Sequence, residues 1–194
     1  MKNIFLRLRA RWKLVLGWAV GLFIFSVSVG IMGAYVLAYT STEEFCVSCH
    51  EMSYNFAEYK GTIHDTNRTG VRAICTDCHV PHAPGPLVLA KIKATKDLYY
   101  TYIFPSIDTK EKFEAKRATM AHRVWKEMQD TDSHECRSCH RADKMSVDLQ
   151  SAKAQARHAK GKEENLTCID CHFGIAHSEP EGPGPRELKA GNSK

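Results

Sequence analysis

The chain has 194 residues, enough for one domain or two small ones. Its formal net charge of +5 is compatible with a nucleic-acid-binding protein until the charges are located. The excess lies at the N-terminus, where five Lys and Arg residues and no acidic residue precede position 14. The rest of the chain is formally neutral, which argues against nucleic acid as a partner.

Residues 14–42 carry no charge and begin with 26 largely apolar positions, LVLGWAVGLFIFSVSVGIMGAYVLAY. At about 1.5 Å per residue, a helix of this length exceeds the roughly 30 Å thickness of the bilayer core. We expect a single transmembrane anchor, with the basic N-terminus in the cytoplasm and the remainder outside it. The alternative is a cleaved signal peptide. Its apolar region is usually about 7–15 residues and ends at an A-x-A-like site, and neither feature matches this segment.

All eight cysteines belong to four C-x-x-C-H motifs. The motifs are Cys46-x-x-Cys49-His50, Cys75-x-x-Cys78-His79, Cys136-x-x-Cys139-His140 and Cys168-x-x-Cys171-His172. In such a motif the two thiols form thioether bonds to haem, and the adjacent histidine reaches the iron. Two zinc sites with four thiolates each are the alternative, but zinc does not require a histidine after every pair. The sequence therefore predicts four covalently bound haem c groups.

The motifs fall into two pairs with an internal repeat. The first two motifs are 29 residues apart and the last two 32, whereas the gap between the pairs is much longer. Each half has a histidine before and a histidine after its second motif: His64 and His82 in the first half, His158 and His177 in the second. Duplication of a two-haem module explains this pattern.

Three helices are expected between and within these modules. One covers about residues 86–105, opened and closed by proline. A second follows Asp108, which can cap it, with Glu111 placed as in a capping box. A third covers about residues 143–159. No segment shows the alternation of a β-strand, so the part outside the membrane is expected to be helical and loop-rich.

The predicted fold class is mainly α: an N-terminal transmembrane helix followed by a small multihaem cytochrome c domain of two duplicated dihaem modules. The expected segments are a cytoplasmic basic segment, 1–13; the anchor, 14–42; a first dihaem module, 43–105; a helical connector with the second dihaem module, 106–178; and a disordered tail, 179–194. Such a domain packs around haem instead of around a large side-chain core.

Each haem iron needs a second axial ligand or keeps an open site, and this choice separates electron transfer from substrate chemistry. Six histidines lie outside the motifs: His64, His82, His122, His134, His158 and His177. The repeat favours His64, His158 and His177 as second ligands, with His82 a candidate by the same symmetry. A surface or packing role is favoured for His122 and His134.

Met52 follows His50 by two residues. A thioether is a reasonable soft ligand for iron, and the position directly after a haem motif favours that role. In most proteins a single methionine is a core residue. Both interpretations stay open from the residues alone.

Taken in order, these segments resemble the NapC/NirT family of membrane-anchored tetrahaem cytochromes. Within the family they resemble the NapC-like branch. The family is related to the small subunit of cytochrome c nitrite reductase. The resemblance covers nearly the whole chain. It is carried by the anchor, C-V-S-C-H-E-M at 46–52, G-V-R-A-I-C-T-D-C-H-V-P at 70–81, K-D-L-Y at 96–99, D-S-H-E-C-R-S-C-H at 132–140 and T-C-I-D-C-H-F-G-I-A-H at 167–177.

The resemblance implies a protein of the cytoplasmic membrane with its haem domain in the periplasm. Such a protein oxidises menaquinol or ubiquinol and passes the electrons to a periplasmic terminal reductase, as in nitrate or nitrite respiration. Association with that reductase or with further copies of the chain is compatible with this role. Lys91 and Asp97 are implied to border the quinol site, with Asp97 as proton acceptor and Lys91 orienting a quinol oxygen. The alternative for both residues is a solvated helix face.

The resemblance also implies a ligand for each haem. It assigns Met52 to the first haem, with His50 as the alternative, His79 and His158 to the second, His140 and His177 to the third, and His172 and His64 to the fourth. The nitrite-reductase branch uses a lysine of the partner at the second haem, and this chain has His158 instead. His82 has no secure counterpart in the family.

Two other functions are alternatives for a chain with four haem motifs. A terminal reductase would bind nitrite or hydroxylamine at an open haem. The sequence disfavours it, because the histidines suffice to close three irons and no C-x-x-C-K motif is present. A relay without a quinol site is the other possibility, and the anchor makes it the weaker interpretation.

Overall fold

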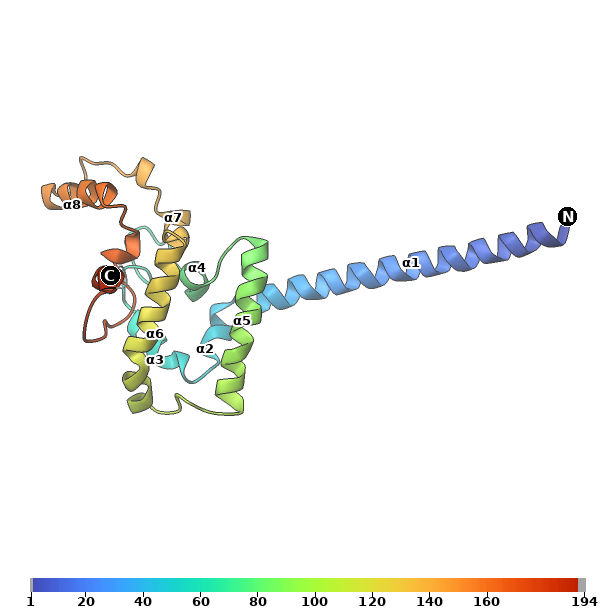
Figure 1. Cartoon of the computed structure of the whole chain (residues 1–194), viewed down its shortest axis with the longest axis horizontal. Helices are drawn as coiled ribbons and strands as arrows, with labels where there is room; N and C mark the ends of the chain where they lie inside the picture. Colours follow the sequence, from blue (N-terminus) through green and yellow to red (C-terminus); the bar gives the residue numbers. More distant parts are fainter. Residues whose placement is uncertain (1, 192–194) are drawn as a thin grey trace. The chain divides into compact units, whose positions relative to one another are not determined.

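The computed structural model describes residues 2–191, with side chains from residue 11 onwards. The chain forms two compact units, Met1–Thr42 and Glu43–Lys194. The described residues form helices and loops and contain no strand, which confirms the mainly α fold class (Figure 1). Both expected dihaem modules lie within the second unit.

The first unit is one long helix, α1 (Lys2–Tyr39). Its segment Arg11–Tyr39 is long and apolar enough to cross a membrane, and none of its residues is buried. Three residues with hydroxyl groups follow the last residue of the helix. The Thr40, Ser41 and Thr42 hydroxyls donate to carbonyl oxygens of the last turns at 2.7–2.9 Å. These bonds satisfy carbonyls that a helix end would otherwise leave without partners.

Short helices carry cysteines of the four motifs: α2 (Glu43–Val47), α4 (Cys75–His79), α7 (His134–Cys139) and the 3₁₀ helix η2 (Cys168–Asp170). Helix α3 (Met52–Tyr59) follows the first motif, and the 3₁₀ helix η1 (Ala142–Lys144) follows the third.

The three longer helices differ slightly from expectation. They are α5 (Pro84–Tyr102), α6 (Lys110–Asp130) and α8 (Ala152–Glu163). The residue that caps α6 is Thr109 and not the expected Asp108. The Thr109 hydroxyl accepts a hydrogen bond from Lys112 N at 3.3 Å. Asp108 instead pairs with Lys112 Nζ at 2.6 Å. Helix α8 begins later than expected because Ser151 caps it by accepting from Ala154 N at 3.2 Å.

Helix α6 is the centre of the second unit (Figure 1). The ring of Phe113 near its start packs on Tyr54 of α3 at 5.0 Å, and Trp125 near its end packs on Phe173 at 5.3 Å. Among the described residues, four hydrophobic residues are buried: Tyr59, Phe113, Trp125 and Ile169. So small a side-chain core agrees with a unit that folds around prosthetic groups.

The C-terminal segment differs from the expected disordered tail. Residues Pro185–Gly191 form α9, and Pro185 is fully buried. The Gln129 amide of α6 donates to Pro185 O at 2.9 Å and to the buried Asp170 carboxylate at 2.7 Å. Composition alone could not reveal that the C-terminal segment is held by α6, because the hydrogen bonds of Gln129 go to acceptors that are distant from it in sequence. Residues 192–194 of the expected tail lie outside the described residues.

We predict that Gln129→Leu destabilises the second unit, because it leaves Asp170 and the Pro185 carbonyl without their amide donor. The expected loss is about 1–3 kcal/mol in the free energy of unfolding. Urea denaturation followed by far-UV circular dichroism measures it. Lys126→Gln is the control on the same helix. It removes only the exposed Lys126–Asp130 ion pair and should cost less than about 0.5 kcal/mol. Equal losses in both variants would contradict the prediction.

Candidate functional site

In α4 and α7 both cysteines of the motif lie three positions apart on the helix and therefore on the same side, whereas in the first and fourth motifs only the first cysteine lies in the helix, α2 or η2. In α4 the Asp77 carboxylate accepts from Ile74 N at 2.8 Å, and in η2 Asp170 accepts from Thr167 N at 2.7 Å. The aspartate shared by the second and fourth motifs thus has the same capping contact in both. This correspondence agrees with an internal duplication.

The four motifs lie next to one another in chain order. A hydrogen bond with the Cys75 thiol lowers the pKa of Cys46, so the first and second motifs are in contact. Burial raises the pKa of Cys78 to about 11, with a further contribution from the Cys136 thiol of the third motif. Burial also raises the pKa of Cys136, assisted by Cys168 of the fourth motif. No disulfide joins any of the eight cysteines in the described part of the chain, so all eight are available for thioether bonds.

The histidines of the last three motifs each face another histidine. The ring centroids are 6.2 Å apart for His79 and His177, 6.0 Å for His140 and His64, and 6.2 Å for His172 and His158. Two imidazole nitrogens, each about 2 Å from one metal ion, would place the ring centroids about 6 Å apart. The three pairs therefore fit haem iron held between two histidines.

These pairs use the same histidines that the resemblance implies, but in other combinations. The resemblance joins the second motif to His158, the third to His177 and the fourth to His64. In the structure, His177 lies at the second motif, His64 at the third and His158 at the fourth. The position of each distant histidine depends on tertiary contacts of its loop or helix, which motif spacing does not determine.

Two of these distant histidines show a further property of metal ligands. Burial is the main cause that lowers the pKa of both His64 and His177, so both are neutral near pH 7. A neutral ring can offer a nitrogen lone pair to a metal. Both rings also have a buried Nδ1 that no side chain satisfies, and only backbone groups, of Ile175 at His64 and of Asn55 at His177, compensate the burial. Such a nitrogen is costly unless another interaction compensates it.

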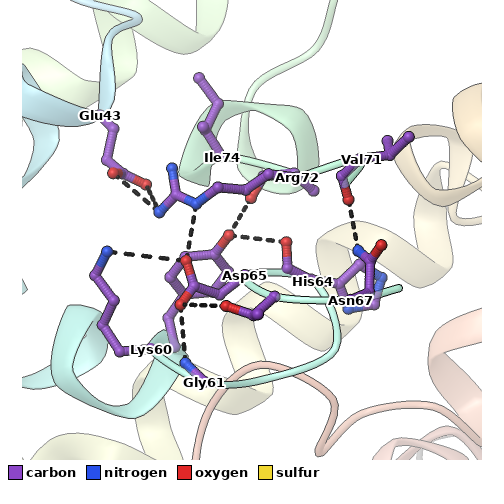
Figure 2. A network of polar contacts seen from close by, with 12 residues as sticks. Glu43, Lys60, Gly61, His64, Asp65, Asn67, Val71, Arg72 and Ile74 are labelled. Atoms are coloured by element: carbon purple, nitrogen blue, oxygen red, sulfur yellow. Dashed lines mark hydrogen bonds and ion pairs between the residues drawn. The ribbon is translucent and has the colours of Figure 1, made fainter. Parts of the chain in front are cut away.

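A polar network fixes the loop that carries His64 (Figure 2). The Arg72 guanidinium binds the Asp65 carboxylate at 2.8 Å and reaches Glu43 of α2 at 2.8 Å. The Tyr59 hydroxyl donates to the His64 carbonyl at 3.0 Å. The network therefore ties the His64 backbone to the helix that begins the first motif.

A second ion-pair cluster fixes the backbone beside His177. Ser178 N donates to the Glu58 carboxylate at 3.0 Å, and the same carboxylate binds Arg117 at 2.5 Å. Arg117 also binds Glu114 at 2.6 Å. This cluster joins α3, α6 and the segment after His177. Neither Arg117 nor Arg72 was singled out in the sequence, because no motif marks a residue that only positions a ligand.

Two more positioning residues were not evident from the sequence. Ser133 is fully buried with a left-handed φ of 50°, and its Oγ accepts from Ile169 N at 3.2 Å, which joins the third and fourth motifs. Gln150 lies before α8, and its Oε1 is 2.7 Å from His158 Nδ1. No sequence pattern marks a serine that accepts from a distant backbone N–H or a glutamine that contacts a histidine, so neither role could be identified from the sequence.

The first motif lacks a facing histidine ring among the described residues. Met52 is the first residue of α3 and is exposed, as is His50. Burial lowers the pKa of Lys91 in α5, and the Cys46 thiol opposes that shift, so Lys91 lies close to the first motif. Asp97 is exposed and lies six positions further along α5, about 120° around the helix axis from Lys91.

The other three histidines lie apart from these pairs. His82 Nε2 is 3.9 Å from Asp77, and His134 is the exposed first residue of α7. His122 packs on Trp125 at 5.4 Å and borders a cavity of about 410 Å³ between α6 and α9. Within the described part of the chain, no ring contact joins any of the three to a motif histidine.

The contiguous motifs and the histidine pairs define a multihaem c-type cytochrome. The model of the NapC/NirT cytochrome c family, N-terminal region, matches residues 8–182, and the chain belongs to this family. This confirms the resemblance found in the motifs and supports haem c as the cofactor.

Three relatives show the extent of the similarity. The denitrification system component NirT of Stutzerimonas stutzeri is 50% identical over 167 residues, covering 84% of this chain and 83% of the relative. A putative tetraheme cytochrome-c type protein of Allochromatium vinosum is 47% identical over 161 residues, covering 83% and 84%. The cytochrome c-type protein TorY of Escherichia coli O157:H7 is 49% identical over 151 residues, covering 78% of this chain but only 41% of TorY. No solved structure matches the chain.

The Glu58 cluster predicts a specific dependence of stability on pH. Burial raises the pKa of Glu58, but hydrogen bonds from Arg117 and Ser178 N–H outweigh it, so the pKa lies below its ordinary value of 4.5. The cluster is therefore fully stabilising above pH 4.5, and this stabilisation is lost as the pH falls through the folded-state pKa.

We expect Glu58→Gln to lower the free energy of unfolding by about 1–3 kcal/mol at pH 7 and to approach wild type in acid. Urea denaturation between pH 7 and pH 3 tests this. Glu114→Gln is the matched control, since Glu114 binds the same Arg117 without contacting Ser178. A pH-independent difference between Glu58→Gln and wild type is the contrary result.

Proposed function

We propose that this chain is a membrane-anchored tetrahaem cytochrome that oxidises membrane quinol and delivers the electrons to a periplasmic terminal reductase. The observation that supports it most directly is the contiguous order of the four C-x-x-C-H motifs. One end of that order lies beside Lys91 and the other beside α8. When bound, each haem c accepts and releases one electron.

The eight motif cysteines are proposed to hold four haems, and the facing histidines to close three irons. We assign His79 with His177 to the second haem, His140 with His64 to the third, and His172 with His158 to the fourth. The ring separations support these assignments over the combinations that the resemblance implies. Met52, or His50 alone, is left for the first haem.

We place the quinol site on α5 beside the first motif. Quinol oxidation releases two protons with two electrons, so the site needs a proton acceptor and a group that orients the quinol oxygen. Burial lowers the pKa of Lys91, which makes its ammonium easier to deprotonate and suits a group that donates a hydrogen bond in a sheltered position. Asp97 is the proposed proton acceptor. Because the two side chains leave α5 in different directions, each would approach the quinol from its own side.

The positive charges at the start of the chain favour the cytoplasmic side, and they support the proposal that the second unit lies in the periplasm. The name of the NirT relative, a denitrification system component, supports a reductase of nitrogen oxides as the electron acceptor. The match to TorY covers under half of that protein, so its acceptor is not transferred to this chain.

Stopped-flow reduction of the haems by a menaquinol analogue tests the quinol site. We expect Asp97→Asn and Lys91→Gln each to slow haem reduction by about tenfold or more, because proton transfer or quinol orientation is lost. Reduction by dithionite should be unchanged. Lys126→Gln and Asp130→Asn on α6 are charge-matched controls and should reduce at the wild-type rate. Undiminished quinol reduction in both α5 variants would exclude this site.

A further inference from the structure

Helix α5 has an apolar face that points away from the rest of the second unit. The residues that face inward, Leu87, Ala90 and Lys91, are half-buried. The large apolar residues are exposed instead, with Leu89, Ile92 and Ile103 at 60%, 60% and 61% exposure. In an ordinary surface helix the polarity is reversed, with apolar residues inward.

Most of the exposed apolar residues form one continuous stripe, and two more, Leu98 and Tyr102, are exposed on the Lys91 side of the helix. At 3.6 residues per turn the stripe covers an arc of about 140°, which begins about 60° around the helix axis from Lys91. The stripe consists of Val88, Leu89, Ile92, Tyr99, Tyr100 and Ile103. Lys93 and Lys96 lie within the same arc and are also exposed. Helix α5 forms one edge of the second unit (Figure 1).

The composition of this stripe suits a lipid surface better than a protein partner. Aliphatic side chains, tyrosines and lysines together are typical of helices at a membrane interface, where the lysine stems lie along the apolar layer and the ammonium groups reach the headgroups. Interfaces between proteins are depleted in lysine at their centres. Two lysines in the middle of the stripe therefore favour phospholipid.

The short connection to α1 provides the second line of evidence. Helix α1 ends at Tyr39 and the second unit begins at Glu43, so three residues separate them. Three residues span at most about 11 Å. If α1 crosses a membrane, the second unit is held at its surface, where even a weak lipid affinity is expressed at high effective concentration.

We propose that the outward face of α5 lies in the boundary between headgroups and acyl chains of the bilayer that α1 crosses. This inference rests on the proposed anchor and deepens the proposed function. It sets α5 at the depth where quinol diffuses, with Lys91 outside the stripe and directed toward the first motif. The helix then acts as the second membrane contact of the chain.

Photo-crosslinking in nanodiscs tests this placement. The full-length holoprotein is reconstituted in phosphatidylcholine and phosphatidylglycerol with a diazirine in the acyl tail, and labelled peptides are mapped by mass spectrometry. We expect tail label on the α5 peptide well above that on the exposed α6 peptide. The double variant Leu89→Gln/Ile92→Gln should lose most of this label, whereas Leu149→Gln, an exposed leucine before α8, should keep it.

The outcomes separate this inference from the proposed function. Label on α1 but none on α5 above the α6 level would overturn the placement of α5 and leave the anchor intact. No label on α1 would overturn the anchor and the placement together.

A separate observation concerns the ligand of the fourth haem. Gln150 Oε1 lies 2.7 Å from His158 Nδ1, and the Gln150 amide nitrogen donates to Ser146 O at 3.4 Å. The second contact fixes which end of the amide faces the ring. Oε1 must therefore accept from Nδ1–H, which leaves the lone pair on Nε2.

Among the three distant histidines, His158 alone has a side-chain acceptor in the described structure, whereas His64 and His177 meet backbone groups, of Ile175 and Asn55. We infer that Gln150 is a positioning residue that orients His158 and lowers the reduction potential of the fourth haem. An acceptor on Nδ1–H raises the basicity of the metal-bound nitrogen, and a more basic ligand favours the oxidised iron. This inference rests on the proposed pairing of His158 with His172.

Redox titration of the holoprotein combined with EPR tests the role of Gln150. Gln150→Leu should raise the potential of one haem, with about a tenfold change in its reduction equilibrium constant, or 59 mV for one electron. Gln150→Glu, a stronger acceptor, should lower that potential. Gln155→Leu is the matched control, because Gln155 holds the same segment through Val147 O and Gln150 O without contacting His158.

His158→Ala identifies the haem concerned by converting it to a high-spin signal. If His158→Ala leaves every haem low-spin, the pairing fails and the inference fails with it. If a high-spin haem appears but Gln150→Leu leaves all potentials unchanged, the role of Gln150 alone is overturned. Equal shifts in Gln155→Leu and Gln150→Leu would also overturn it, since they would indicate only a structural effect.

Discussion

Each imidazole that faces a motif histidine has to be delivered from a distant part of the chain, and this requirement organises the second unit. A C-x-x-C-H motif supplies two thiols and one imidazole from five residues, but it cannot supply the opposite imidazole. His64 comes from a loop before the second motif, and His177 from the segment after the fourth. The contacts that hold these two segments therefore decide which motif each histidine reaches.

Polar networks do much of this positioning. The described side-chain core has few apolar members, whereas Arg72 and Arg117 each bind two carboxylates from different segments. Isolated surface ion pairs contribute little to stability, but a bidentate arginine in a network with backbone donors fixes geometry as well. In a unit built around prosthetic groups, such networks replace part of the geometric role that apolar packing has in an ordinary domain. Residues such as Glu58 therefore stabilise the unit and also hold the backbone beside a facing histidine.

The sequence predicted the features that are local and missed those that are not. The motifs, the apolar N-terminal helix and the helical character of the second unit follow from spacing and composition. The combination of His177 with the second motif does not, because it depends on α3 and α6 meeting around Glu58 and Arg117. The order in the C-terminal segment was missed for the same reason, since Pro185 is held by Gln129, 56 residues away in sequence.

Helix α5 shows how one element can meet two requirements with its two faces. Lys91 on the inward face lies within electrostatic reach of Cys46, so that face is tied to the first motif. The outward face is apolar and exposed, which is unfavourable in water and favourable at a lipid boundary. In the proposed function, an electron donor that is soluble only in the bilayer must reach a haem held in a water-exposed unit. A helix with its outward face in lipid and its inward face at the first motif would remove the aqueous gap between them. On the same proposal, the first motif, the one without a facing histidine among the described residues, serves the donor, whereas the facing histidines of the other three motifs close the iron.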